Sequence, residues 1–203
     1  MKRFANIISI LCHPILMVTY GVLLALSYTY LAIYPFSVKF YLAGGAFLCT
    51  ALIPGLLVLL MVKSGAAGDL DLSDRRERAI PYLIFITANM VCLFYLFKTH
   101  MPFWLLSMFI GVCLGLLVAL CINFSWKISV HTIGIGGLLG AVMGAARLQY
   151  VNPYGLFIVI VIACGLTATS RIILKKHTPM QVYAGFALGF LCTFGATFLS
   201  FIL

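Results

Sequence analysis

Acidic residues are nearly missing from this chain of 203 residues. Only four occur, and all of them lie in one short segment, between positions 69 and 77. Charged residues of both signs make up 8% of the sequence, whereas a soluble globular domain carries about 25%. So few charges cannot cover a water-facing surface, which excludes an ordinary soluble domain. The hydrophobic fraction of 64% predicts instead a protein surrounded by lipid.

The sequence also lacks the signs of a nucleic-acid partner, although its net charge is +9. It contains no helix-turn-helix pattern, no zinc-finger spacing of cysteines and no basic stripe along a polar helix. Loops that face anionic lipid headgroups explain the excess of lysine and arginine better. We therefore expect the membrane bilayer as a partner and no nucleic acid, while nothing in the sequence specifies an oligomeric state.

Long apolar runs predict an all-α, polytopic transmembrane bundle of about six to seven spans, in a single domain over residues 1–203. Each spanning helix needs about 20 mainly apolar residues, and the runs lack the period-two alternation of a membrane β-barrel. His13-Pro14 interrupts the first run, which predicts a kink, and we interpret His13 as a satisfied helix residue and not as a ligand. The candidate spans are residues 6–33, 38–62, 80–98, 101–122, 131–149, 153–171 and 178–202.

Basic residues are distributed unequally between the two ends of these seven spans. One end holds Lys39, Lys98 and Arg147, and the other holds Lys2, Arg3, Lys63, Arg75, Arg76, Arg78, Lys127, Arg171, Lys175 and Lys176. Cytoplasmic loops carry the excess of lysine and arginine, so ten against three predicts a cytoplasmic N-terminus. We expect the protein in a bacterial inner membrane. The bias falls to five against three if half of the ten bind phosphate.

The first of three polar clusters lies in the acidic segment. Arg75 and Arg78 are three residues apart, so a helix would place both on one face. The planar guanidinium group suits phosphate oxygens, which makes the pair a candidate phosphate site. The alternative is a solvated loop with local ion pairs.

The second cluster, Lys127, Ser129 and His131, stands at the start of the fifth predicted span. Backbone N–H groups at a helix N-terminus are unpaired and carry partial positive charge, which favours a bound anion. A hydroxyl and an imidazole two residues apart could both face such an anion. Capping of the helix by Ser129, with an incidental His131, is the alternative.

In the third cluster, Arg171 ends the sixth span and His177 begins the seventh. His177 and Gln181 are four residues apart and share a helix face, where the amide would accept the imidazole N–H and fix its tautomer. Anchoring of Arg171 and its neighbouring lysines at the membrane interface is the alternative. Two spans separate each cluster from the next, so all three are expected at the same end of the bundle.

Two of these clusters carry a familiar spacing, Ser129-x-His131 followed by Ser170-Arg171-x5-His177. The pattern resembles the P-S-G-H and S-R-x5-H-x3-D motifs of the type-2 phosphatidic acid phosphatase superfamily, and the similarity covers roughly residues 69–190. The resemblance implies a helical bundle that hydrolyses lipid phosphomonoesters or pyrophosphates without a metal or other cofactor. The expected partner is then a phospholipid or polyprenyl-phosphate substrate.

Roles follow from the resemblance by position. His177 would be the nucleophile that forms a phosphohistidine, and His131 would protonate the leaving oxygen. Arg171 and Ser129 would hold the phosphoryl oxygens, and the remaining candidates for phosphate contacts are Arg78, Arg75 and Lys127.

The sequence departs from the family pattern at several positions. Gln181 replaces the aspartate, so it would orient the histidine but leave an imidazolium charge uncompensated. Ile128 and Val130 replace the proline and glycine of the second motif. The first motif, K-x6-R-P, is not present as such, and Arg78-Ala-Ile-Pro81 is only a partial match to it.

Three functions therefore remain open. The first is a lipid phosphatase that uses a histidine nucleophile. The second is a catalytically impaired binder or transporter of lipid phosphates, which the missing aspartate would explain. The third is a phosphotransferase that passes the phosphoryl group to an alcohol. The acidic segment is also similar to the Mg²⁺-pyrophosphate motifs of prenyltransferases, although only one such segment is present.

Overall fold

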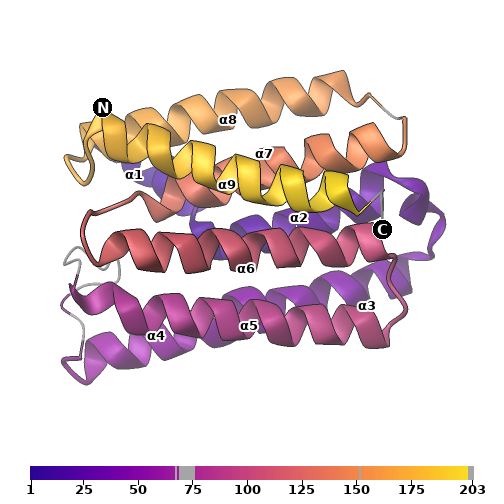
Figure 1. The fold of residues 1–203 in the computed structure, drawn as a ribbon, viewed down its shortest axis with the longest axis horizontal. Coiled ribbons are helices and arrows are strands. Elements are labelled where there is room, and N and C mark those ends of the chain that lie inside the picture. The colour runs from indigo at the N-terminus through magenta and orange to yellow at the C-terminus, as the bar shows by residue number, and fades with distance from the viewer. Residues whose placement is uncertain (67, 69–75, 151, 201–203) are drawn as a thin grey trace.

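The computed structural model describes residues 1–66, 68, 76–150 and 152–200, and every regular element in this part of the chain is a helix (Figure 1). The α-helices are α1 (Lys2–Leu11), α2 (Pro14–Tyr28), α3 (Phe36–Phe47), α4 (Ile53–Lys63), α5 (Ala79–Lys98), α6 (Phe103–Asn123), α7 (Val130–Leu148), α8 (Tyr154–Ile173) and α9 (Pro179–Leu199). A π-helical turn, Leu48–Leu52, joins α3 to α4, and 3-10 turns cover Tyr30–Ile33 and Arg76–Arg78. The predicted all-α fold is confirmed.

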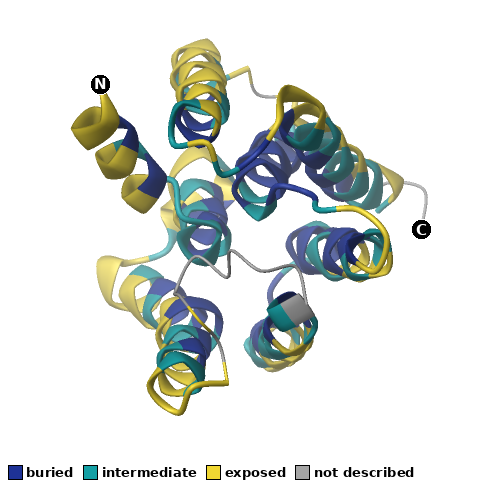
Figure 2. Cartoon of the chain, turned by 90° about the vertical axis from the view of Figure 1, so that its left-hand side faces the viewer, coloured by how far each residue is buried: buried dark blue, intermediate teal, exposed yellow. Residues whose placement is uncertain are grey.

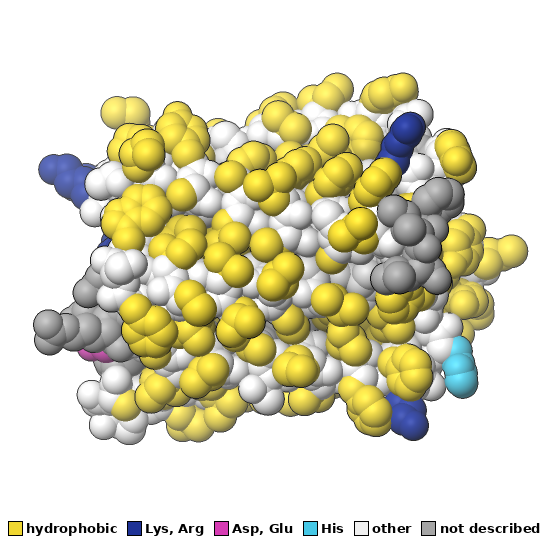
Figure 3. All heavy atoms as spheres, viewed as in Figure 1, with side chains coloured by type: hydrophobic (Ala, Val, Ile, Leu, Met, Phe, Trp, Pro, Cys, Tyr) yellow, Lys and Arg dark blue, Asp and Glu magenta, His cyan; other side chains and the backbone are white. Residues whose placement is uncertain are grey.

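Six helical segments are long and apolar enough to cross a membrane, and the bent pair of α1 and α2 brings the number to seven. The helices run side by side along the long axis of the molecule (Figure 1). Figure 3 shows hydrophobic side chains spread over the length of one broad face, whereas the visible Lys and Arg side chains lie near its two ends. An apolar belt with a charged rim suits a bilayer, so this is an integral membrane protein with the predicted number of spans.

The first span is broken at His13 and Pro14, where the sequence predicts a kink. The axes of α1 and α2 differ by 53° at this break. Pro14 is the first residue of α2, a position that needs no backbone N–H. His13 caps α2, because its Nδ1 accepts a hydrogen bond from the Ile15 backbone N–H at 3.4 Å. The ring of His13 is therefore engaged at the start of a helix, and its interpretation as a satisfied helix residue and not a ligand stays a prediction.

Helix α7 is the most enclosed span of the bundle. In an 18-residue apolar stretch of α7, 72% of the residues are buried, against 28% to 50% in the corresponding stretches of the other long helices. In Figure 2 the buried residues of the surrounding helices are turned toward the interior of the bundle. Glycines let α9 lie directly against α7: a Cβ at Gly189 would overlap the carbonyl oxygen of Ile133, and one at Gly140 would overlap that of Phe190.

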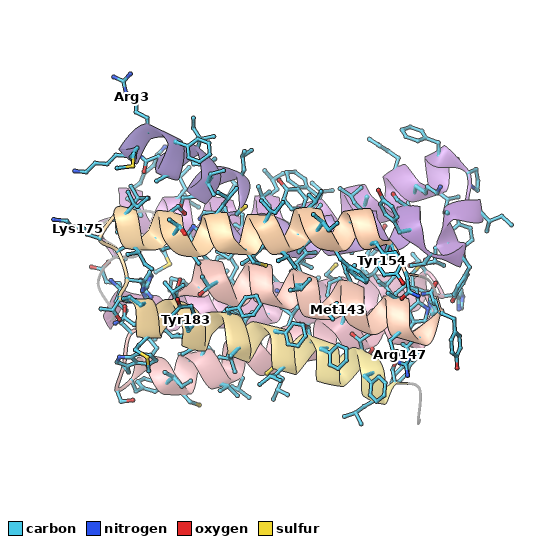
Figure 4. The ribbon with its side chains drawn as sticks, turned by 90° about the horizontal axis from the view of Figure 1, so that it is seen from above. Arg3, Met143, Arg147, Tyr154, Lys175 and Tyr183 are labelled. Carbon is cyan, nitrogen blue, oxygen red and sulfur yellow. The ribbon has the colours of Figure 1, made fainter. Side chains whose placement is uncertain are left out.

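Three helices begin at the same end of the bundle as α1, namely α5, α7 and α9, and α8 ends there (Figure 1). Figure 4 shows Arg3 and Lys175 at this end and Arg147 and Tyr154 at the opposite one. The described residues of the three polar clusters precede or follow these helix ends. They therefore gather at one end, as the even number of spans between them predicts.

Candidate functional site

A cavity of about 220 Å³ lies at this end of the bundle. The break between α1 and α2, α4, the start of α5, the start of α7, the end of α8 and the loop before α9 all contribute to its wall. Its polar lining is His13, Arg78, Tyr82, His131, Arg171 and His177. Two guanidinium groups and no carboxylate are among the described lining residues, so the cavity favours an anion.

Arg78 links the first polar cluster to the second. It ends the 3-10 turn before α5 and is only 4% exposed. Its Nη1 donates a hydrogen bond to the backbone carbonyl of Ile128 at 3.1 Å, which ties the loop before α5 to the loop before α7. The neighbouring Glu77 carboxylate instead accepts the backbone N–H of Gly68 at 2.8 Å and is not among the lining residues.

Arg171 stands in the last turn of α8 and is 2% exposed. A buried guanidinium is costly unless its N–H groups are hydrogen-bonded, and here Nη1 donates to the Ser9 hydroxyl of α1 at 2.5 Å. Arg171 thus points into the protein and does not anchor the helix at the membrane interface. The exposed Lys175, four residues on, fits that anchoring role.

His177 is buried in the loop between α8 and α9 and is held by Gln181. The His177 Nδ1 lies 3.1 Å from the Gln181 Oε1, and the same oxygen accepts the backbone N–H of Thr178 at 3.2 Å within a capping box. An amide oxygen accepts and does not donate. Nδ1 of His177 must therefore carry the hydrogen, which leaves the lone pair of the neutral ring on Nε2.

The electrostatic surroundings keep His177 unprotonated. Burial lowers the pKa of His177 from its ordinary value of 6.5 to about 4. The hydrogen bond to Gln181 opposes this shift, while the positive charges of Arg78, Arg171 and Lys127 add to it. At neutral pH the ring is therefore a neutral base with an available Nε2, as a nitrogen nucleophile must be.

His131 is the second residue of α7 and lies beside His13. The two imidazole rings meet edge to face, with centroids 5.0 Å apart. The His131 ring also hydrogen-bonds the backbone of Ser9. Its Nε2 is buried and has no hydrogen-bond partner among the described residues. Buried polar atoms are nearly always satisfied, so this nitrogen is suited to a polar ligand in the adjoining cavity.

Ser129 occupies the N-cap position of α7, yet its side chain makes no capping hydrogen bond. The Oγ is buried and has no partner in the part of the chain that the structure describes, which argues against the capping alternative. The backbone N–H of Ser129 donates to the carbonyl of Gln181 at 3.3 Å and joins the second cluster to the third. Neither Ser129 nor Lys127 lines the cavity, and Arg75 lies outside the described residues.

Three members of the site were missed by sequence reasoning. Ser9 gave no signal, because a single serine in an apolar run is ordinary. His13 did give a signal. A histidine directly before a proline marks the start of a helix, where the side chain can turn away from the helix axis toward a site. Tyr82, one turn after Arg78, was also within reach of helical spacing, and its buried hydroxyl has no hydrogen-bond partner among the described residues.

The arrangement is suited to binding and attacking a phosphoryl group. Helices α5, α7 and α9 direct their N-termini toward this end, where their partial positive charges favour an anion. Two buried arginines supply fixed full charges, and a neutral histidine supplies a lone pair.

No family model matches this chain, and no similar protein was found among curated proteins or solved structures.

Proposed function

We propose that this protein is a membrane-embedded, metal-independent phosphatase that removes the phosphate of a lipid phosphate or pyrophosphate through His177. The observation that supports this most directly is the shared cavity of Arg78, Arg171 and His177, with the lone pair of His177 on Nε2. The resemblance of the motifs to the type-2 phosphatidic acid phosphatase superfamily supports the same chemistry. The expected substrate is a phospholipid or a polyprenyl phosphate.

The proposed reaction has two displacements at phosphorus. The Nε2 lone pair of His177 forms an N–P bond while the bond from phosphorus to the lipid oxygen breaks, and His131 gives a proton to that leaving oxygen. Water then attacks the phosphohistidine and gives a proton to His131, the N–P bond breaks, and inorganic phosphate leaves with neutral His177 and protonated His131 restored. The arginines stabilise the negative charge spread over the phosphoryl oxygens, with Arg75, Ser129 and Lys127 proposed as further phosphate ligands.

Gln181 can supply one of the two effects expected of the motif aspartate, namely orientation of the histidine. Its oxygen fixes the orientation and tautomer of His177, but an amide does not offset the positive charge that develops on the ring. In serine proteases the analogous change of aspartate to asparagine costs about 10⁴ in rate, through the wrong tautomer. Since the tautomer is correct here, we expect Gln181→Asp to preserve or raise turnover, and a steep loss would count against this placement.

We also propose that the N-terminal end, and with it the site, faces the cytoplasm of a bacterial inner membrane. The excess of lysine and arginine at this end supports the orientation. A tag at the N-terminus should be cleaved by protease only after spheroplasts are broken. Cleavage in intact spheroplasts would reverse the orientation.

Phosphate release by the detergent-purified protein tests the proposed function. The substrates are phosphatidic acid, phosphatidylglycerophosphate and a polyprenyl pyrophosphate, each with and without chelator. His177→Ala is the test variant, and His100→Ala, a histidine at the opposite end of the bundle, is the matched control. Release that survives the chelator and disappears only in His177→Ala supports the proposal. No release by the wild type from any substrate overturns it.

A binder or transporter of lipid phosphates is the second candidate, and the amide at position 181 favours it. In that case phosphate-lipid binding would survive His177→Ala, and neither form would turn over. A phosphotransferase would share the histidine step but would form a transfer product when a candidate alcohol is added. Measuring inorganic phosphate and lipid product in the same reaction separates the three.

A further inference from the structure

A second cavity, of about 90 Å³, lies next to the polar one inside the bundle. The two cavities share four lining residues, Pro14, Ile15, Phe85 and Val130. Beyond this common wall the second cavity is lined by α2, the π-helical turn Leu48–Leu52, α5, α6, α7 and α9. The polar site therefore adjoins an internal space and not only the end of the bundle.

This second cavity extends along the helices. On α7 the lining residues run from Val130 to Ala141 at spacings of three and one, which is one face of a helix. On α6 they run from Leu105 to Leu116. Eleven steps at 1.5 Å each give a length of about 16 Å along each helix. That is roughly half of the hydrocarbon thickness of a bilayer, which is about 30 Å.

The wall of this cavity is mostly apolar, and small residues create the space. The polar members of the wall are Thr50, Asn89 and Thr193; Asn89 donates through Nδ2 to Phe85, and its buried Oδ1 has no partner among the described residues. Gly21, Gly115 and Gly137 all line it, and a Cβ at any of them would meet its neighbours only at ordinary contact distances. Two of the polar lining residues use their hydroxyl hydrogens inside the fold, since Thr50 donates to Ala46 and Thr193 to Gly137 or Gly189. An elongated apolar space of this kind suits a hydrocarbon chain.

We propose that this cavity receives one hydrocarbon chain of the lipid whose phosphate occupies the polar cavity. The inference rests on the proposed function and names how its substrate is held. A water-sized group needs roughly 10–15 Å³ of such space, so the cavity holds about six to nine of them, enough for one chain and not for two. The substrate class is then a phosphorylated single-chain alcohol, or a lipid that leaves any second chain in the bilayer.

Val130 stands at the junction and explains a departure from the family motif. It is the first residue of α7 and lines both cavities, at the position where the resemblance expects glycine. Together with Pro14, Ile15 and Phe85 it forms the apolar wall that the two cavities share. The phosphate would stay on the polar side of these residues, and the chain would pass between them.

Hydrolysis of a homologous series of n-alkyl phosphates, from ethyl to decyl, tests the inference. In the wild type kcat/KM should rise with chain length, by up to about fourfold for each methylene that leaves water, and then level off. Val112→Phe places a ring in the cavity wall on α6. Leu114→Phe adds the same ring to the lipid-facing side of that helix, where Leu114 is 48% exposed.

The expected result is a loss of at least tenfold in kcat/KM for decyl phosphate in Val112→Phe, with ethyl phosphate unchanged. Leu114→Phe should match the wild type at every length. If Val112→Phe follows the wild type along the whole series, the chain does not enter the cavity and the inference is wrong. If the wild type hydrolyses no alkyl phosphate, it is the proposed function that fails.

Photolabelling tests the cavity without turnover, and so separates the two failures. A decyl phosphate with a diazirine at the chain end is bound and photolysed, and the labelled peptides are mapped. Label is expected on cavity residues such as Leu105, Met108 and Ala141, and it should be lost in Val112→Phe. Label only on lipid-facing residues such as Leu114, matching that of the same probe without its phosphate, would overturn the inference.

Discussion

Replacing Gln181 with glutamate tests the electrostatic account of His177. Glutamate has the same length as glutamine, so a carboxylate oxygen can occupy the place of Oε1 and keep both the capping box and the contact to Nδ1, which is 3.1 Å long in the wild type. Only the charge changes. The variant therefore separates the orientation of the imidazole, which glutamine already provides, from compensation of a positive ring, which it does not.

The size of the effect follows from the contact distance. The pKa of His177 is about 4 in the wild type, and an opposite charge within about 4–6 Å shifts a pKa by roughly 1–3 units. The carboxylate favours the protonated ring, so the pKa of His177 should rise to between about 5 and 7. Because attack needs the unprotonated Nε2, the acid limb of kcat/KM should move upward by the same amount. Above that limb the rate should increase, since the carboxylate offsets the charge formed on the ring.

The assay is phosphate release from one soluble alkyl phosphate between pH 3.5 and 8.5, for the wild type and Gln181→Glu. The second ionisation of the phosphate, with a pKa of about 6, affects both proteins equally and cancels in the comparison. Acid limbs that coincide would refute the placement of the Gln181 oxygen against Nδ1. A limb that moves downward would refute the sign of the interaction.

Protonation of His177 is also linked to stability. The folded pKa of about 4 lies below the ordinary value of 6.5, so the unfolded state binds the proton more tightly. Stability should thus be constant above pH 6.5 and fall, by about 3 kcal/mol in full, as the pH drops to about 4. Thermal unfolding in detergent should show this fall in the wild type and less of it in His177→Asn. Equal pH dependence in both would contradict the burial of His177.

Two further predictions concern the packing of α9 and the contact of α1 with Arg171. Gly189→Ala places a Cβ against the carbonyl oxygen of Ile133 and should lower the melting temperature markedly. Gly195→Ala, with no atom near its added Cβ, should be neutral or stabilising by up to about 1 kcal/mol. Similar melting curves for the two variants would argue against the close packing of α7 and α9. Ser9→Ala removes an acceptor of Arg171, and a hydrogen bond to a charged group contributes roughly 1.5–3 kcal/mol. It should raise KM for alkyl phosphates more than it lowers kcat, which steady-state kinetics at a temperature where both proteins stay folded would check.

The sequence predicted the fold because the signal was redundant. Each span repeats the same apolar composition, so an error at one boundary does not alter the number of helices. The proline at position 14 lacks a backbone N–H, and that local property predicted the break between α1 and α2 without knowledge of any neighbour. The contact of His13 with His131 was not predictable in this way, because it depends on how α2 packs against α7.

The site residues were predictable where two features of the sequence placed them: their spacing along the chain, and the even number of spans between the clusters. Arg78, His131, Arg171 and His177 are each beside a helix end, and an even number of spans returns these ends to one face. The hydrogen bond from Arg171 to Ser9 was not predictable, because it depends on how α1 packs against α8. The second cavity was not predictable for a similar reason, because its shape depends on how several helices pack together and not on any single residue.

The site draws on the first and the last spans of the chain. Ser9 and His13 are made before α7 and α8, whereas His177 and Gln181 follow with α9. On the proposed function, a nascent chain that has inserted α8 but not yet α9 would hold the proposed phosphate ligands Arg78 and Arg171 but neither the proposed nucleophile nor its orienting amide. Such a chain would not yet cleave lipids of the membrane that it is entering.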